Sequence, residues 1–76
     1  MIEPRQYEYI AIERISSSKS GKTHLYHVTN RRFGTTLGHI RWFARWRQYV
    51  YEPSSHTVYS AGCMRDIIDF IEERRR

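Results

Sequence analysis

The chain has 76 residues, a formal net charge of +5 and one cysteine. A chain of this length forms one domain with a small core, because it buries only ~60% of the surface that its unfolded form exposes. A single cysteine excludes a disulfide within the chain, and no apolar run reaches the ~18 residues that a membrane span needs. We therefore expect one cytoplasmic domain over residues 1–76 that does not bind membranes.

Alternating polar, aromatic and β-branched residues predict strands through the first four fifths of the chain. The predicted strands cover residues 7–15, 23–30, 35–43, 47–53 and 57–60. Short polar turns separate these strands, which is typical of hairpin connections. The sequence therefore predicts an antiparallel meander of four or five strands.

The first turn, SSSKSGKT at residues 16–23, ends in the Gly-Lys-Thr of a phosphate-binding loop. Such a loop requires Gly, four residues and then Gly-Lys-Ser/Thr, placed between a strand and a helix. Ser16 stands where the first Gly is required, and the residues after Thr23 alternate like a strand. We interpret the segment as a hairpin tip, where Lys19 and Lys22 approach phosphate only as point charges.

Positive charge is concentrated in the middle of the chain, because residues 15–51 contain no Asp or Glu. Its densest part, GHIRWFARWRQYVYEP at residues 38–53, interleaves arginine with aromatic residues. Arginine binds phosphate bidentately, and an exposed ring that stacks on a base contributes about 1–3 kcal/mol. We therefore predict a nucleic-acid-binding sheet face, on which Arg41, Phe43, Arg47, Tyr49 and Tyr51 lie together. The full predicted contact set is Lys19, Lys22, Arg31, Arg32, Arg41, Phe43, Arg45, Trp46, Arg47, Tyr49 and Tyr51.

Some of these aromatic residues have an alternative role in the core of so small a protein. Trp42 shares strand parity with Ile40, so we expect it to be buried. Trp46 lies in the bend between two predicted strands, and its burial stays open.

The end of the chain changes to a helical period. Met64, Ile67, Ile68 and Ile71 follow the i, i+3, i+4, i+7 spacing of an amphipathic helix, predicted over about residues 62–74. We expect Ser60 to be its N-cap. The predicted fold is therefore α+β, with one C-terminal helix packed on one face of the sheet. The expected core consists of Ile10, Ile12, Val28, Ile40, Trp42, Val50, Val58, Ile67, Ile68, Phe70 and Ile71.

Catalytic and metal-binding patterns are weak in this sequence. Cys63 lies at the edge of the apolar helical stripe, which favours a small buried side chain over a nucleophile. His24 and His27 are three residues apart in a predicted strand, so they point to opposite faces. We expect a binding protein rather than an enzyme, with no metal and no cofactor.

The second half of the chain carries the pattern Gly-x-x-x-Trp-x-x-x-Trp-x-x-Tyr-x-aromatic-x-Pro, followed by Thr-Val-aromatic and by Cys-x-x-Asp-Ile-x-x-Phe. With this pattern the chain resembles a small uncharacterised family of bacterial and phage proteins. The resemblance implies a compact domain of mobile-element origin and assigns no activity. The matching residues are Gly38, Trp42, Trp46, Tyr49, Tyr51, Pro53, Thr57, Val58, Tyr59, Cys63, Asp66, Ile67 and Phe70.

Charge and aromatic content together predict a protein that binds DNA or RNA without catalysis. The alternative is a phage or mobile-element accessory protein that inhibits a host protein or sequesters a small nucleotide signal. A short meander leaves unpaired strand edges, so a homodimer or other homo-oligomer is a further expectation.

Overall fold

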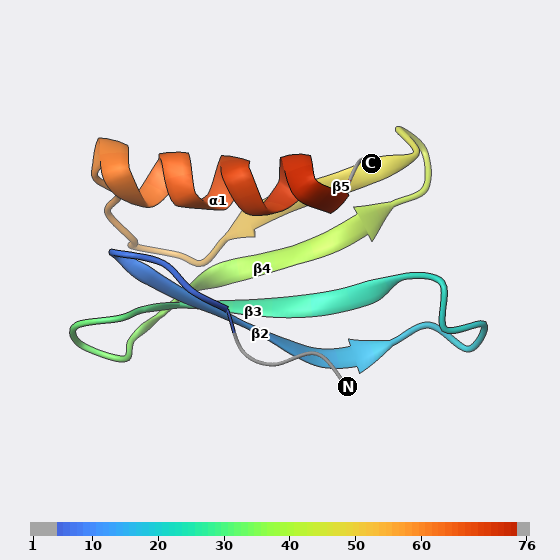
Figure 1. Cartoon of the computed structure of the whole chain (residues 1–76), viewed down its shortest axis with the longest axis horizontal. Helices are drawn as coiled ribbons and strands as arrows, with labels where there is room; N and C mark the ends of the chain where they lie inside the picture. The colour runs from blue at the N-terminus through green and yellow to red at the C-terminus, as the bar shows by residue number, and fades with distance from the viewer. Residues whose placement is uncertain (1–4, 75–76) are drawn as a thin grey trace.

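A computed structural model describes the backbone of residues 5–74 and the side chains of residues 7–74. The sheet has the order β1-β2-β3-β4-β5, all neighbouring strands are antiparallel, and α1 packs on one face of it (Figure 1). The predicted α+β fold is therefore confirmed. The elements are β1 (Arg5–Gln6), β2 (Ile10–Ser17), β3 (His24–Asn30), β4 (Thr36–Phe43), β5 (Gln48–Pro53) and α1 (Ala61–Arg74).

The strand expected at residues 57–60 is wrong, because this segment is an unpaired connection between β5 and α1. Side-chain hydrogen bonds, rather than pairing with a neighbouring strand, hold this segment in position. The Tyr59 hydroxyl donates to the Leu37 carbonyl at 2.6 Å, and the Thr57 hydroxyl donates to the Ser54 carbonyl at 2.9 Å. Val58, expected in the core, points outward and is 88% exposed. The short additional strand is β1, at the other edge of the sheet.

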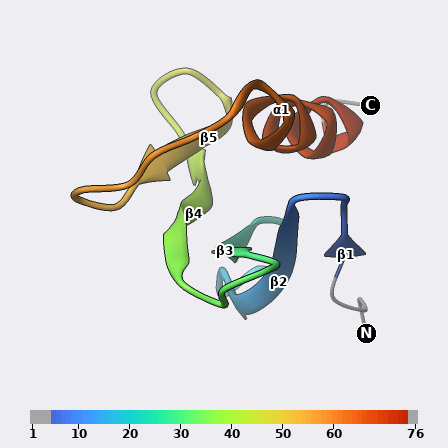
Figure 2. The same ribbon diagram turned by 90° about the vertical axis from the view of Figure 1, so that its left-hand side faces the viewer.

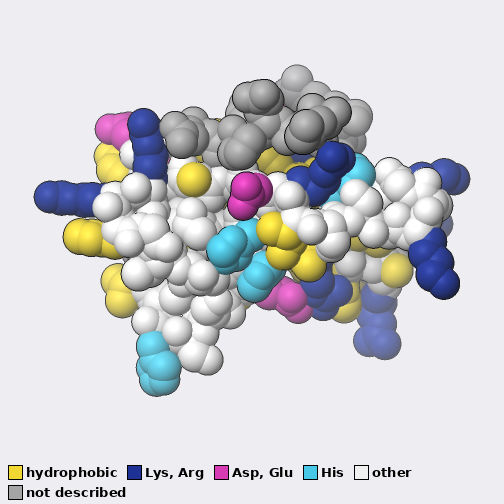
Figure 3. Space-filling view, turned by 90° about the horizontal axis from the view of Figure 1, so that it is seen from below, with side chains coloured by type: hydrophobic (Ala, Val, Ile, Leu, Met, Phe, Trp, Pro, Cys, Tyr) yellow, Lys and Arg dark blue, Asp and Glu magenta, His cyan; other side chains and the backbone are white. Residues whose placement is uncertain are grey.

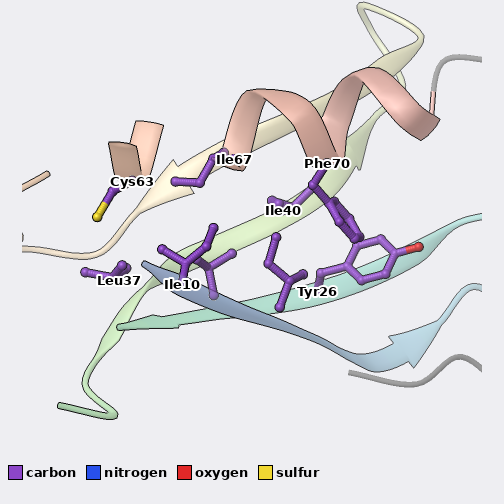
Figure 4. Close-up of a cluster of buried hydrophobic side chains, with 9 residues drawn as sticks. Ile10, Tyr26, Leu37, Ile40, Cys63, Ile67 and Phe70 are labelled. Carbon is purple, nitrogen blue, oxygen red and sulfur yellow. The ribbon is translucent and has the colours of Figure 1, made fainter. Parts of the chain in front are cut away.

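The core lies between α1 and the sheet face toward which alternate residues of β2, β3 and β4 point (Figure 4). Phe70 meets the fully buried Tyr26 edge to face, with ring centroids 4.9 Å apart. Ser60 caps the helix as expected, since its hydroxyl accepts a hydrogen bond from the Cys63 backbone N–H at 3.1 Å. The core residues are Ile10, Ile12, Tyr26, Val28, Leu37, Ile40, Cys63, Ile67 and Phe70.

Two further residues expected in the core lie outside it. Ile68 is 57% exposed, because it follows the buried Ile67 by 100° around the helix and so turns away from the sheet. Val50 pairs with Arg41 across β4 and β5, and therefore lies on the open face of the sheet. Ile71 is only partly buried against the core.

Gly38 allows β5 to bring Tyr51 close to the backbone of β4. A Cβ atom at residue 38 would lie 2.6 Å from the Tyr51 hydroxyl, which is closer than such atoms approach in proteins. The Tyr51 hydroxyl lies 2.6 Å from that of Tyr59, which in turn donates to the Leu37 carbonyl. This chain of hydrogen bonds ties β5 and the connection to β4 at one point.

The meander determines which loops share an end of the molecule. The turn from β2 to β3 and the turn from β4 to β5 both lie at the end where α1 finishes, while the turn from β3 to β4 lies at the opposite end (Figure 1). The sheet also curves, so that β4 and β5 rise from the plane of β2 and β3 and α1 lies on the concave side (Figure 2).

Candidate nucleic-acid interface

One end of the molecule collects cations from three elements, and we call it the basic end. Lys19 and Lys22 lie in the turn from β2 to β3, and Arg45 and Arg47 lie in the turn from β4 to β5. Arg74 is in the last turn of α1 at the same end, where its guanidinium lies 4.1 Å from the centre of the Phe70 ring. The basic end thus joins five cations that are up to 55 positions apart in sequence.

Trp46 stands between Arg45 and Arg47 at the tip of the turn and is 63% exposed. Its ring meets the Phe43 ring at nearly a right angle, with centroids 4.9 Å apart. The turn is closed by hydrogen bonds from the Trp46 and Arg47 backbone N–H groups to the Phe43 carbonyl, at 3.1 and 2.9 Å. A ring that is largely open to solvent therefore stands at the tip of the turn, flanked in sequence by two exposed arginines.

Arg31 and Arg32 do not join this group, although the sequence prediction combined them. Both lie in the turn from β3 to β4, at the opposite end of the sheet. Arg31 donates through Nη1 to the Tyr7 carbonyl at 2.7 Å, and the Arg32 guanidinium lies over the Phe33 ring at 5.6 Å. Both arginines therefore make contacts within their own end of the sheet, and the Arg31 guanidinium is used to hold the backbone at Tyr7.

Tyr49 and Tyr51 lie on the face that α1 covers, and not on the exposed face predicted for them. The register pairs Trp42 with Tyr49 and Ile40 with Tyr51, so both tyrosines share the face of Ile40. The Tyr49 hydroxyl accepts a hydrogen bond from the His24 backbone N–H at 3.2 Å. Tyr51 is held in the hydrogen-bonded chain described above, so neither ring is an open stacking surface.

Trp42 is more exposed than expected, at 36%, although it does lie on the same face as Ile40. Its position near the end of β4 places it past the end of the core, where its ring contacts Tyr49 edge to face at 5.4 Å. Trp42 borders two hollows of ≈ 330 and ≈ 270 Å³ at the basic end. The first is shared with Trp46, Arg47, Gln48, Tyr49 and Arg74, and the second with Ser16, Ser17, Ser18, Thr23, His24, Leu25 and Arg41.

The open face of the sheet is not the continuous basic surface that we predicted. Register places Glu13, His27, His39 and Glu52 in one row across β2, β3, β4 and β5. The two histidine rings are stacked with centroids 5.3 Å apart, and Glu52 pairs with Arg41 at 2.7 Å. Figure 3 shows histidine and acidic side chains in the middle of this face, with Lys and Arg toward the ends. Arg41 and Phe43 lie here, with the guanidinium 5.2 Å from the ring centre.

Comparison with known proteins gives one informative match. No protein-family model and no solved structure matches this chain. An uncharacterized 9.3 kDa protein of Acholeplasma phage L2 is 32% identical over 59 residues, which cover 72% of this chain and 76% of the phage protein. This chain belongs to the family of that phage protein. The expected relationship to small uncharacterised phage proteins is confirmed, and the match names no activity.

In this member of the phage family, several residues of the sequence pattern have clear structural roles. Gly38, Tyr51 and Tyr59 form the junction between β4, β5 and the connection to α1. The Asp66 carboxylate accepts a hydrogen bond from the Tyr9 backbone N–H at 3.3 Å, which ties α1 to the start of β2. Sequence reasoning missed this junction because tyrosines with strand parity suggest a binding face as readily as a core.

Cys63 is buried in the core, as its place on the helical stripe indicated. Among the described residues, no three His, Cys, Asp or Glu side chains come together in the way that a metal ion requires. Within the same part of the chain, no helix has the length and apolar character of a membrane span.

Proposed function

We propose that this protein binds nucleic acid through the basic end, as a binding protein and not as an enzyme. The observation that carries the proposal is the exposed Trp46 ring, flanked in sequence by Arg45 and Arg47, at the end of the molecule that also carries the lysines of the turn from β2 to β3 (Figure 1). An accessible ring flanked by cations suits a chain that alternates aromatic bases with phosphates. Four of the five cations at this end come from residues 15–51, a stretch without Asp or Glu, and this supports the same partner, while Arg74 lies 3.8 Å from Glu73.

A single-stranded segment fits this surface better than a duplex. Bases in a duplex are stacked on each other, so their faces are closed to Trp46, whereas an unpaired base is open to stacking worth about 1–3 kcal/mol. Lys19, Lys22, Arg45 and Arg47 would then contact phosphates, and Trp42 would border the path between them. Arg41 contributes less in this proposal, because Glu52 already neutralises it.

The experiment is a titration of fluorescent single-stranded DNA, single-stranded RNA and duplex DNA, with tryptophan emission recorded in parallel. We expect single-stranded binding whose affinity falls with salt, with a log–log slope of about −3 for four phosphate contacts. Trp46→Ala should weaken binding by about tenfold or more, since one stacking contact is lost.

The matched control uses the opposite end of the sheet, where Phe33 is equally accessible at 73% exposure. Phe33→Ala, and Arg31→Ala with Arg32→Ala, should leave the affinity within about twofold of wild type. Equal losses from both ends would mean that net charge alone attracts the oligonucleotide, and the proposed interface would be wrong.

A small nucleotide is the alternative partner, and the hollow between Trp42, Trp46 and Arg74 favours it over a host protein at this end. Mononucleotides added to the same titration distinguish the two. Competition at concentrations similar to those of the oligonucleotide would favour a nucleotide-sequestering protein. No competition by mononucleotides, with oligonucleotide binding intact, would favour a polymer that contacts several sites at once.

A further inference from the structure

An apolar groove runs between β5 and the exposed flank of α1, on the side of the molecule away from the open sheet face. Its helix wall consists of Met64, Ile68 and Ile71, and its sheet wall includes Tyr51 and Pro53. The groove encloses ≈ 360 Å³, and Met64 and Ile68 are 49% and 57% exposed. Ile68 makes no contribution to the core of this chain, so its position is explained best by contact with something outside it.

β5 itself forms the edge of the sheet beside this groove, because the strand order ends with it. Edge strands are normally protected by charged side chains or by a covering segment, since their unpaired backbone groups invite another strand. The other edge carries β1 over part of β2. β5 carries only one charged residue, Glu52, and that residue is engaged by Arg41 on β4. Pro53 protects only the end of β5, so most of this edge and the groove form one continuous surface.

The charges at the upper rim of the groove are self-complementary. Arg65 and Glu72 are seven residues apart, or two helical turns, so both lie on one side of α1, next to the apolar flank. Ile68 lies midway between them. When two such helices pack antiparallel about Ile68, Arg65 of each chain lies opposite Glu72 of the other. A rim that matches itself after a two-fold rotation is the property of an isologous interface.

We propose that two copies of this chain associate through β5 and α1, about a two-fold axis that passes close to Ile68. The two β5 strands pair antiparallel and join two sheets into one, while Met64, Ile68 and Ile71 of the two helices cover each other above the junction. The basic ends lie at opposite ends of this dimer, outside the interface. This proposal does not depend on nucleic-acid binding. If the chain proves to be a monomer, the proposed binding of nucleic acid at the basic end still stands.

The first test is sedimentation equilibrium of the intact chain over a wide concentration range, from about 1 µM to 1 mM. We expect a monomer–dimer equilibrium. Ile68→Glu should weaken it by about 100-fold or more, because the axis would bring two carboxylates together in an apolar contact. Val58→Glu is the matched control, since Val58 is the more exposed residue but lies outside the groove. A wild-type chain that stays monomeric throughout would overturn the proposal and leave the groove to a different protein.

The second test uses charge reversal and identifies the partner as a second copy. Arg65→Glu alone and Glu72→Arg alone should each weaken dimerisation by about tenfold, because each creates two like-charge contacts across the axis. The double variant should regain most of the wild-type affinity, since both pairs are restored with reversed polarity. Helix content by circular dichroism checks that each variant is folded. Failure of the double variant to regain affinity while folded would reject the antiparallel arrangement.

Discussion

Tyr51 shows how a single hydroxyl links the junction of β4 and β5 to pH. Its burial, together with the hydrogen bond to Tyr59, raises its pKa above the ordinary value of 10.0. The folded protein therefore disfavours the phenolate, while the unfolded chain ionises near pH 10. The stability that this group contributes is complete below the unfolded pKa and is lost as the pH rises above it.

We expect Tyr51→Phe to make the alkaline loss of stability less steep. Each phenol with a raised pKa lowers the free energy of unfolding by up to ~1.4 kcal/mol per pH unit above about pH 10. Burial raises the pKa of Tyr26 as well, so the slope should decrease in the variant without vanishing. Urea unfolding at several pH values between about 9 and 11 measures how steeply the free energy of unfolding falls with pH. Parallel curves for both proteins, displaced only by a constant, would show that the Tyr51 hydroxyl is not the titrating group.

At the scale of the element, the turn between β4 and β5 combines strain with charge. Arg47 has a φ of 55°, in the left-handed region that costs a non-glycine residue about 1–2 kcal/mol. The energy is tolerated because the turn sets the register of β5 and projects Trp46 into solvent.

Arg47→Gly should weaken oligonucleotide binding without destabilising the fold. The variant loses a cation, so its affinity for single-stranded oligonucleotides should fall about threefold to tenfold, while its free energy of unfolding stays equal or rises by up to about 1 kcal/mol. Arg45→Gly is the control, because residue 45 lacks a positive φ and glycine there should cost about 0.5–1 kcal/mol. Denaturant unfolding of the two variants gives the comparison. A destabilised Arg47→Gly protein would mean that the arginine side chain holds the turn.

The same turn explains which parts of the sheet the sequence could predict. Period-two alternation correctly grouped Ile10 with Ile12 and Ile40 with Trp42, because residues within one strand have a fixed relation. It could not give the relation between β4 and β5, since a change of one residue in the turn moves all of β5 to the other face. Tyr49 and Tyr51 were therefore assigned to the open face and Val50 to the core, when the register reverses all three.

At the scale of the whole molecule, the core is small enough for single residues to determine folding. Nine buried side chains form it in the described part of the chain, and Phe70 is the largest one that α1 contributes. Replacing a buried Phe by Ala costs about 3–5 kcal/mol, whereas a small domain has a total stability that starts at about 5 kcal/mol.

We therefore expect Phe70→Ala to leave much of the protein unfolded at 37 °C, a temperature at which the wild type should be folded. Ile68→Ala removes a side chain from the same helix but from its exposed flank, and should cost less than about 1 kcal/mol in the monomer. Thermal unfolding by circular dichroism at low protein concentration compares them. Equal melting temperatures for the two variants would contradict the description of the core.

The overall distribution of charge could be read only partly from the sequence. The acid-free stretch of residues 15–51 was evident, but the meander distributes its cations (Figure 1). Lys19, Lys22, Arg45 and Arg47 lie at one end, Arg31 and Arg32 at the other, and Arg41 on the open face. The predicted meander already implies this division, because successive turns alternate between the two ends of the sheet, but the predicted contact set combined all of these cations. Glu13 and Glu52 lie outside the acid-free stretch in sequence. Strand pairing nevertheless places them beside His27 and His39, which belong to that stretch.

In the binding mode that we propose, the row of Glu13, His27, His39 and Glu52 would limit the length of nucleic acid that one molecule can cover. If a strand bound at the basic end continued over the open face, it would meet the Glu13 carboxylate and the ion pair of Arg41 with Glu52, so its phosphates would gain no net attraction there. In this binding mode, the occluded site would therefore be short. Many copies would bind side by side on a long single strand, and saturation would be reached at a high ratio of protein to nucleotide.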